Sequence, residues 1–540
     1  MISSIKIKGF RGFAEEQELK LSKPNGKKGS GLTVIVGPNN GGKSTIIESF
    51  KAMSLGTDIS FAEGQRNEEA GSVVEIVLSS ESGSIQSLET ILAGGHKAKR
   101  NPGPEYGNYH PYDPSIIVLS SRRFFDPYSK EASHGAGDLF AARPDSITLN
   151  TRGQPIDADD NKLFKIIEDP KSIEEFNSLL KQILGYKLDW TVDLSNTGNY
   201  YVKITNNGYH DSDGLGEGLV SLLFIVAALL NSSPNKLLVI DEPELSLHPQ
   251  LQRNLLDIIL EKSRDHQILY ATHSPEMVSI DAILNGGTLA RVVNSGNGSK
   301  IYQLELNREI TNFLKGTTKN RNNPHILAYD ARSCFFADDR SAGLIIVEGQ
   351  EDVVLLDKAV NLLEIKNKIL FFGFGAGGAE NIRHIATILS SLGFERICCL
   401  YDGDKVEECK NTRKELSKEG NLFKKRCLKC GFKVLPADDI RDKECPFHDK
   451  CINIINGDNC KSCEYKNETP ESCASNKCGN IKDIQVCEKC KYMKIGIFNN
   501  KGKIKSDYEP KFKDLLNEIA TEYGYEGYLL ELARGYAKYP

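Results

Sequence analysis

Continuous hydrophobic runs, each ending at a glycine or a polar turn, recur through residues 1–310. A strand that is buried on both faces of a parallel sheet has this pattern, whereas a half-exposed strand alternates hydrophobic and polar positions. The predicted strands are residues 32–37, 236–244 and 266–275. Longer hydrophobic stretches between them, such as 219–230 and 249–263, have the length and pattern of helices. This alternation predicts a doubly wound α/β domain.

A polar, turn-rich stretch at residues 311–340 separates this pattern from a second series of hydrophobic runs. We interpret the stretch as a linker between two domains. The second series begins at 342–349 and again combines strand-like runs with helical patterns, which indicates another α/β fold. Residues from about 81 to 165 are rich in glycine, proline and charged residues, and we interpret them as an insertion in the first domain.

The composition adds limits to this picture. The length of 540 residues is enough for about two to four domains. With a formal net charge of −5, any nucleic acid must be bound by a local basic patch. The N-terminus has no signal-peptide pattern, and the longest hydrophobic run, 219–230, is too short to cross a bilayer. We therefore expect a cytoplasmic protein without a membrane partner.

A phosphate-binding loop follows the first predicted strand. The sequence GPNNGGKST at residues 37–45 fits G-x-x-x-x-G-K-[ST] between a strand and a helix. In such a loop Lys43 contacts the terminal phosphates and Ser44 ligates Mg²⁺, while backbone amides bind the remaining phosphate oxygens. The predicted nucleotide-binding residues are Gly37, Asn39, Asn40, Gly41, Gly42, Lys43, Ser44 and Thr45.

Two acids end the second predicted strand, in the sequence LLVIDE. We expect Asp241 to hold the hydration shell of the Mg²⁺ ion and Glu242 to activate the attacking water. His273 follows the third strand in ATHSP and is placed to contact the γ-phosphate. A lone histidine is more often structural, but its position in this order of motifs favours the nucleotide site.

These motifs together resemble the heads of ABC-type ATPases. The segments IKIKGFRGF at 5–13 and DEPELSLHPQLQ at 241–252 are similar to SMC-like and RecF-like members that act in DNA repair and phage defence. The resemblance implies that two protomers sandwich ATP, and that Gly216 and Gly218 of DGLGEGLVSLL form the signature contact to the partner's nucleotide. Gly216 replaces the usual serine and Glu217 a glycine, so we expect slow turnover.

Four carboxylates follow strands of the second series. Glu348 and Asp352 lie one helical turn apart, where a helix begins after the strand. Asp402 and Asp404 end the run ICCLYDGD. Because ligands collect at the carboxyl ends of parallel strands, we expect all four to converge. Carboxylates that lie this close need divalent cations to offset their repulsion.

The order of Glu-Gly, a glycine-rich turn (371–381) and D-x-D is similar to the TOPRIM fold of topoisomerases, primases and some nucleases. The resemblance implies that the acids bind one or two Mg²⁺ or Mn²⁺ ions and cleave phosphodiester bonds. It also implies one more metal-site acid, Asp439 or Asp442, and a late lysine near the scissile phosphate. We assign that lysine to Lys501, with the alternatives Lys503 and Lys505. D-x-D alone would equally fit a turn with a solvated acid pair.

An ABC-type head followed by TOPRIM in one chain resembles the OLD (overcoming lysogenisation defect) nucleases, which include Gabija-type and retron-associated anti-phage effectors. The resemblance implies an ATP-regulated, metal-dependent nuclease that acts on DNA as a homodimer or larger homo-oligomer, with room for a second defence-system component. One alternative is a tRNA-cleaving toxin of the same architecture. Another is a non-cleaving DNA-binding or sensing ATPase, whose acids hold only a structural metal.

Ten of the 14 cysteines lie between residues 427 and 490, in a polar segment that contains three C-x-x-C pairs. This spacing indicates structural Zn²⁺, with an iron–sulfur cluster as the alternative. The predicted zinc ligands are Cys427, Cys430, Cys445, His448, Cys451, Cys460, Cys463, Cys473, Cys478, Cys487 and Cys490. The zinc would either only hold this segment together or also form a contact to nucleic acid or a partner. The predicted parts are an ABC-type head at 1–310, a linker at 311–340, a TOPRIM core at 341–442, the zinc insert at 443–492 and the end of the TOPRIM domain at 493–540.

Overall fold

The protein forms two compact units. The first unit contains Met1–Arg321 and Ala328–Asp338, and the second contains Asn322–Leu327 and Asp339–Pro540. The computed structural model describes residues 1–54, 59–90, 97–101, 116–121, 169–194, 200–204, 217–319, 335–336, 343–373, 375–418, 421, 423–424, 427, 429–441, 496–499 and 501–526. The first residues of the predicted linker continue helix α7, Arg308–Lys319.

A six-stranded sheet, largely parallel, forms the centre of the first unit. Its strand order is β14-β13-β3-β12-β11-β8, and the pair β13–β14 is antiparallel. The strands are β3 (Leu32–Val36), β8 (Ile116–Leu119), β11 (Leu237–Asp241), β12 (Gln267–Ala271), β13 (Thr288–Asn294) and β14 (Ser299–Gln303). Every residue of β3, β11 and β12 is buried, so the three predicted strands are confirmed.

A second, antiparallel sheet lies beside helix α1 (Lys43–Ser54). Its order is β2-β1-β5-β6-β7-β4. The strands are β1 (Ile2–Lys8), β2 (Gln17–Lys20), β4 (Ile59–Ser60), β5 (Glu75–Ser80), β6 (Ile85–Thr90) and β7 (Lys97–Asn101). Buried side chains of α1, such as Phe50, share one core with both sheets. Each such fully buried aromatic side chain stabilises the fold by about 1.5–3 kcal/mol.

The region predicted as an insertion, from about 81 to 165, differs from that expectation in its described part. Strands β6 and β7 complete the antiparallel sheet, and β8 forms the edge of the central sheet. β7 has the sequence KAKRN, in which only Ala98 is buried. Its backbone pairing fixes it in the sheet although its side chains are polar, which explains why the hydrophobic pattern did not reveal it.

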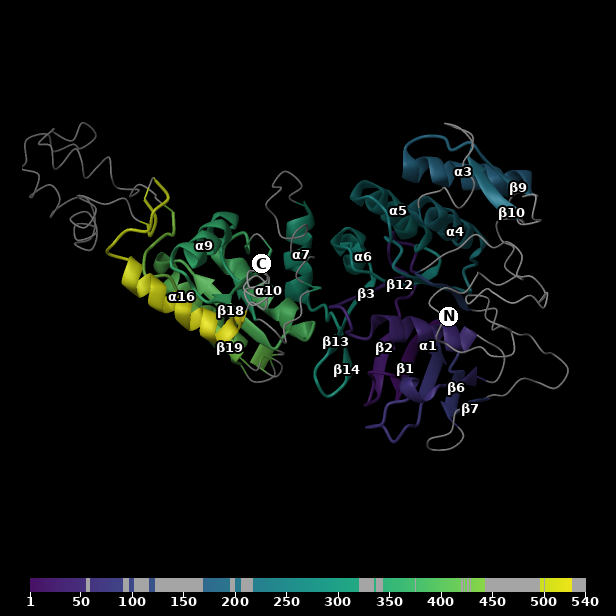
Figure 1. Cartoon of the computed structure of the whole chain (residues 1–540), viewed down its shortest axis with the longest axis horizontal. Helices are drawn as coiled ribbons and strands as arrows, with labels where there is room; N and C mark the ends of the chain where they lie inside the picture. Colours follow the sequence, from purple (N-terminus) through teal and green to yellow (C-terminus); the bar gives the residue numbers. More distant parts are fainter. Residues whose placement is uncertain are drawn as a thin grey trace, which may run out of the picture. The chain divides into compact units, whose positions relative to one another are not determined.

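The helices of the first unit cover the other face of the central sheet. Figure 1 shows α4, α5 and α6 on the side opposite α1 and the antiparallel strands. These helices and their neighbours are α3 (Pro170–Leu184), α4 (Glu217–Asn231), α5 (Pro249–Lys262) and α6 (Ile280–Leu284), with 3₁₀ turns at Glu63–Gln65 and Pro275–Met277. Trp190 of β9 (Trp190–Leu194), which pairs with β10 (Tyr200–Ile204), packs on Phe176 of α3. Among the described helices, none is long and apolar enough to cross a membrane.

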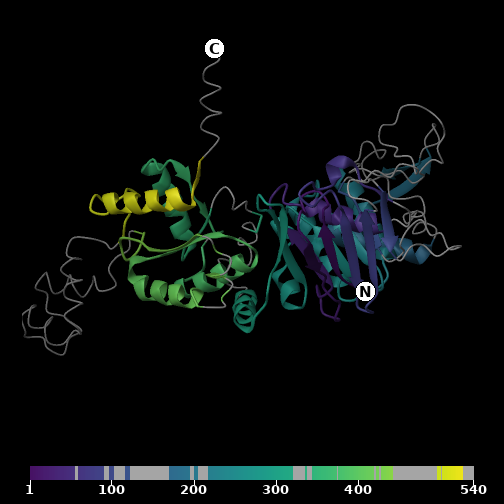
Figure 2. The same ribbon diagram turned by 90° about the horizontal axis from the view of Figure 1, so that it is seen from below.

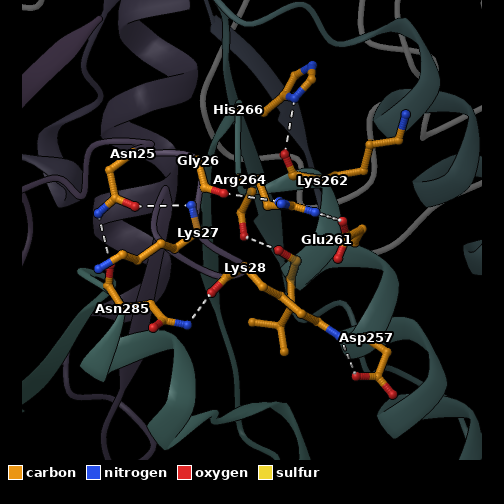
Figure 3. A network of polar contacts seen from close by, with 12 residues as sticks. Asn25, Gly26, Lys27, Lys28, Asp257, Glu261, Lys262, Arg264, His266 and Asn285 are labelled. Carbon is orange, nitrogen blue, oxygen red and sulfur yellow. Dashed lines mark hydrogen bonds and ion pairs between the residues drawn. The ribbon is translucent and has the colours of Figure 1, made fainter.

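The loop before β3 is held by polar contacts to α5 and to the residues that follow α5 and α6 (Figure 3). Gly26 and Arg264 exchange two hydrogen bonds of 3.1 Å, one from the Gly26 amide and one from the Arg264 Nε. The side-chain amide of Asn285 donates to the Lys28 carbonyl over 2.8 Å, and the Lys28 Nζ lies 3.2 Å from Asp257. These bonds fix the start of the strand that carries the phosphate-binding loop.

The second unit is a parallel α/β unit, as predicted. Its sheet has the order β17-β15-β18-β19, and all pairs are parallel. The strands are β15 (Leu344–Ile346), β17 (Leu370–Phe371), β18 (Arg396–Tyr401) and β19 (Lys429–Val434), with a separate pair β16 (Asn367–Lys368) and β20 (Tyr525–Glu526). The helices are α9 (Gln350–Leu362), α10 (Ala379–Ser391), α11 (Val406–Leu416) and α16 (Glu509–Tyr523).

Helices cover both faces of this sheet, with α9 and α16 on one face and α10 and α11 on the other (Figure 2). Alternate residues of β18 point to opposite faces, as a strand requires. Cys398 and Leu400 belong to the core with α9 and α16. The Tyr401 hydroxyl instead donates to Thr412 of α11 over 2.8 Å. The carboxyl ends of β15 and β18 are therefore held rigidly, and the predicted acids follow these ends.

Candidate functional site

The phosphate-binding loop joins β3 to α1 in the first unit. The Lys43 Nζ donates hydrogen bonds of 2.8 Å to the carbonyl oxygens of Gly37 and Pro38. Burial lowers the pKa of Lys43 to about 8, while the acids Glu242, Asp241 and Glu244 oppose this shift. The ammonium group is thus held inside the loop, where it can exchange carbonyl partners for phosphate oxygens.

Two glycines of this loop lie directly on β13. A Cβ atom added at Gly37 or Gly41 would lie 2.2 Å or 2.4 Å from the Val292 carbonyl oxygen. Asn39 and Asn40 are exposed, and Asn40 has a φ of 58°, a conformation that asparagine tolerates. Gly42 precedes α1, and Ser44 and Thr45 lie in its first turn. The Ser44 hydroxyl and the Asp241 carboxylate are oxygen donors, the type that Mg²⁺ prefers.

The acids after β11 face this loop. Asp241 ends β11 in register with Ala271 of β12, and the Glu242 amide donates to the Ala271 carbonyl over 2.9 Å. Glu242 has a φ of 47°, and such strained backbone is concentrated at functional sites. Its Oε1 lies 3.6 Å from Nε2 of His273. Burial first, and then the charge of Lys43, lowers the pKa of His273, which favours a neutral imidazole.

The start of α4 contacts the segment after these acids. The Ser246 hydroxyl donates to Glu217 over 3.0 Å, and a Cβ atom at Gly218 would lie 2.4 Å from the Ser246 carbonyl oxygen. Gly218 therefore has a packing role within its own chain, which the sequence did not reveal. Gly216 lies outside the described residues, and the signature contact of both glycines stays a prediction.

In the second unit, Glu348 follows β15 and Asp402 follows β18. The Asp402 amide donates to the Glu348 Oε1 over 3.1 Å, so one acid orients the other. Asp352, in the first turn of α9, is only 6% exposed, and its Oδ2 accepts a hydrogen bond of 2.7 Å from the Gly349 amide. Asp404 lies in the 3₁₀ turn Gly403–Lys405.

The glycine-rich turn after β17 approaches the same strand end. A Cβ atom at Gly375, whose φ is 89°, would lie 2.5 Å from the Gly349 carbonyl carbon. The Gly378 amide donates to the Glu348 carbonyl over 3.0 Å. The glycine-rich turn therefore lies directly against residues 348–349 and fixes the backbone that carries Glu348.

Burial and repulsion between neighbouring carboxylates raise the pKa values of these acids. Burial raises the pKa of Asp402 to about 8, and repulsion by Asp352 and Glu348 adds to it. Burial likewise raises the pKa of Glu348 to about 7 and that of Asp352 to about 6. A divalent cation would relieve this excess of negative charge, and carboxylate oxygens suit Mg²⁺ or Mn²⁺. Nevertheless, within the described ranges no three acidic, histidine or cysteine side chains are grouped as ligands of one ion.

Asp439, one of the two candidates for a further metal-site acid, has an arginine partner in the structure, and its metal role stays a prediction. It is 3% exposed, and its two oxygens accept hydrogen bonds of 2.9 and 2.8 Å from the Arg441 guanidinium. The remaining arginine contact, Nη1 to Glu351, is 2.7 Å. Hydrogen bonds to Asp439, and then to Glu351, raise the pKa of Arg441 above its usual value. Asp439 thus has a fixed organic cation as its partner, and Asp442 lies outside the described residues.

The role of Lys501, or of the alternatives Lys503 and Lys505, near the scissile phosphate stays a prediction. Lys501 and Lys503 are exposed and Lys505 is partly buried, and the Ile497 amide before this segment donates a 3.2 Å hydrogen bond to the Asp439 carbonyl. Lys405, which sequence reasoning did not select, is 3.4 Å from the Asp404 carboxylate. Its position directly after D-x-D was the available signal.

The cysteine cluster is described only in part. Cys427 and Cys430 lie next to each other, with their Cα atoms 6.0 Å apart, and Zn²⁺ would bind both sulfurs as thiolates. The remaining predicted zinc ligands, residues 445–490, lie outside the described residues, so the zinc site stays a prediction. Cys398 and Cys399 are buried in β18, where burial raises the pKa of both thiols.

The ATPase assignment of the first unit is supported by comparison with known proteins. Residues 32–279 match a family described as "AAA domain, putative AbiEii toxin, Type IV TA system". The Septu protein PtuA of Bacillus thuringiensis is 24% identical over 314 residues, which are 52% of this chain and 74% of that protein. The first unit therefore carries an AAA-family ATPase domain. None of these matches names OLD or TOPRIM, so both assignments stay predictions.

Solved SMC head domains also align with this chain. The head from Thermotoga maritima covers 56% of this chain and 99% of its own, at 16% identity and a TM-score of 0.33. The head derived from Pyrococcus furiosus, bound to the C-terminal domain of ScpA, covers 59% and 99%, at 14% identity and a TM-score of 0.37. Since these scores are low, the fold assignment rests on the strand order and the motifs described above.

Proposed function

We propose that this chain is an ATP-regulated, divalent-metal-dependent nuclease that cleaves phosphodiester bonds in DNA as an anti-phage effector. The observation that carries the proposal is the set of partly buried acids after β15 and β18, in a chain that also has an ATPase domain. Glu348, Asp352 and Asp402 repel one another in a partly desolvated place. A fold maintains such a cluster at a cost in stability, which a bound cation or a reaction explains.

The nucleotide site has the groups that ATP hydrolysis requires. Lys43 is buried in the loop and can bind phosphate oxygens, and the neutral His273 lies 3.6 Å from Glu242. Glu242 would take a proton from the attacking water, and His273 would donate a hydrogen bond to the γ-phosphate. In this proposal a homodimer or larger homo-oligomer forms through the ATPase domains, and nucleotide state controls the second unit.

The second unit would bind Mg²⁺ or Mn²⁺ through Glu348, Asp352, Asp402 and Asp404. When bound, such ions generate the nucleophile and stabilise the leaving oxygen. The chain's own residues orient the site, since the Asp402 amide holds Glu348 and the Gly349 amide holds Asp352. Lys405 and Arg441 supply positive charge beside these acids and are suited to bind a phosphate oxygen.

DNA is the proposed substrate because the sequence of the first unit resembles the heads of DNA-repair ATPases. The matched family is described as a toxin, which keeps tRNA as a second candidate substrate. The cysteine segment is proposed to bind Zn²⁺. Elemental analysis of the purified chain tests this, and a zinc content that is unchanged by Cys460→Ser with Cys463→Ser would contradict it.

The decisive experiment incubates the purified chain with plasmid, single-stranded DNA and tRNA, under Mg²⁺ or Mn²⁺, with and without ATP. We expect DNA cleavage that is lost in the double variant Glu348→Gln, Asp402→Asn. The matched control is Asp438→Asn, which neutralises an exposed acid next to Asp439 and should leave cleavage intact. Cleavage of no substrate, or equal cleavage by the double variant, would refute the nuclease and favour a non-cleaving sensing ATPase.

A further inference from the structure

A buried carboxylate without an assigned role lies two residues after Glu242. Glu244 is 8% exposed, and its Oε1 accepts a hydrogen bond of 2.6 Å from the backbone amide of His273. Its Oε2 is buried, and the Thr272 hydroxyl also favours the charged form of this carboxyl. Burial raises the pKa of this carboxyl, and the His273 amide opposes the shift. Burying an acid in this way lowers the free energy of unfolding, so a hydrophobic residue such as leucine at this position would give a more stable core.

The loop that Glu244 contacts is attached at a second point. The Ser274 hydroxyl donates to the side-chain carbonyl of Gln252 on α5, and the Gln252 amide nitrogen donates to the Leu247 carbonyl over 2.7 Å. The Leu247 amide in turn donates to the Glu244 carbonyl over 3.0 Å. Residues 244–252 thus form a bracket around the loop 272–274.

The bracket determines where the His273 ring can lie. The backbone amide of Glu242 donates a hydrogen bond to the last residue of β12, which fixes Glu242. The His273 ring lies 3.6 Å from the Glu242 carboxylate. Among the described residues, Glu242 is the side chain that contacts the His273 ring, so the position of the ring depends on the backbone of the loop. Glu244 bonds to that backbone at His273 itself.

We infer that Glu244 is a positioning residue for ATP hydrolysis: through the His273 amide it holds the imidazole against Glu242 at the nucleotide site. This inference rests on the proposed hydrolysis of ATP by the first unit. Glu244 is not assigned any contact to nucleotide or metal. Position 244 needs a buried hydrogen-bond acceptor for the His273 amide. Glutamine supplies such an acceptor and should preserve the function, whereas alanine supplies none.

The test compares Glu244→Ala, Glu244→Gln, His273→Ala and the double variant Glu244→Ala, His273→Ala in the full chain. We expect Glu244→Ala to lower kcat about 10- to 100-fold with little change in ATP affinity, since small displacements of a catalytic group have costs of this size. Glu244→Gln should retain most activity. In the His273→Ala background, Glu244→Ala should have almost no further effect, because both changes disable the same group.

The matched control is Gln267→Ala, at the opposite end of β12. Gln267 is 2% exposed and hydrogen bonds to Ile2 and Ser22, so its loss also removes buried hydrogen bonds. It should lower thermal stability without changing kcat of the folded protein. A loss of kcat in Glu244→Ala that adds fully to that of His273→Ala, or an equal loss in Gln267→Ala, would overturn the inference.

A readout that is independent of hydrolysis separates this inference from the proposed function. Hydrogen exchange in a peptide that spans residues 272–277 reports on the His273 amide. Exchange should become at least about tenfold faster in Glu244→Ala but not in Glu244→Gln, since opening free energies set exchange rates. If exchange is faster in Glu244→Ala but the wild-type protein does not hydrolyse ATP, the proposed function fails and Glu244 still holds the loop. If exchange is unchanged in Glu244→Ala, the positioning role fails even in an active enzyme.

Discussion

Replacing Arg441 with methionine removes the guanidinium from Asp439 while keeping much of the hydrophobic stem. Asp439 is 3% exposed, and after the change it keeps the Arg441 backbone amide at 2.9 Å but loses both side-chain bonds. Removing one partner of a fully buried ion pair costs about 3–5 kcal/mol. The arginine side chain is itself 44% exposed, so water can replace part of its interaction. We therefore expect the second unit to lose about 2 kcal/mol of unfolding free energy.

The contact from Arg441 to Glu351 provides the matched control. The Glu351 side chain is 65% exposed, and exposed ion pairs contribute about 0–1 kcal/mol. Glu351→Gln should therefore be nearly silent. The double variant Arg441→Met, Asp439→Asn should recover much of the lost stability, because no charge is left buried without its partner.

The assay has to report on the second unit alone. The single tryptophan, Trp190, lies in the first unit, so its fluorescence follows that unit and should show an unchanged urea midpoint. Urea-dependent hydrogen exchange in peptides of α16 follows the second unit. A chelator keeps divalent ions from replacing the guanidinium. If Arg441→Met unfolds at the wild-type urea concentration, or if the effects of Arg441→Met and Asp439→Asn simply add, the buried ion pair does not have the role assigned to it.

Three further predictions concern other parts of the chain. Lys43→Ala should abolish ATP binding measured by calorimetry, since the ammonium is the buried cation of the phosphate-binding loop, and unchanged affinity would contradict this site. Burial raises the pKa of Asp402 to about 8 and that of Glu348 to about 7, so the native state binds protons that the unfolded chain has released. Stability of the metal-free second unit should therefore fall as pH rises from about 4 to 8, with a weaker fall in Asp402→Asn; a urea midpoint that rises with pH would contradict the sign. Phe512→Ala, at 0% exposure in α16, should cost about 3–5 kcal/mol in urea unfolding, whereas Val354→Ala, at 56% exposure, should cost little.

The sequence predicted those elements whose stability depends on local pattern. Strands β3, β11 and β12 are buried on both faces, so their hydrophobic runs were sufficient. The phosphate-binding loop and the acids after β11 were also predictable, because their spacing follows from the backbone geometry that phosphate binding requires. The parallel sheet of the second unit was predicted for the same reasons as the first.

Contacts between residues distant in sequence could not be predicted. β7 is polar and is held by backbone pairing, so its pattern resembled a loop. The Arg441 guanidinium contacts Asp439 two residues earlier and Glu351 of α9, and no sequence motif indicates either contact. Lys405 was not selected from the sequence, since its position beside Asp404 depends on how the chain folds after β18. Charge pairs of this kind depend on tertiary placement, which periodicity does not encode.

The packing of the phosphate-binding loop on β13 affects how experiments on this chain should be designed. Gly37 and Gly41 leave no space for a methyl group against the Val292 carbonyl oxygen. An alanine at either position would displace the loop even in the absence of ATP, so a loss of activity would not distinguish failed binding from local misfolding. Genetic studies that need an inactive allele with an intact fold should therefore change Lys43 and leave these two glycines in place.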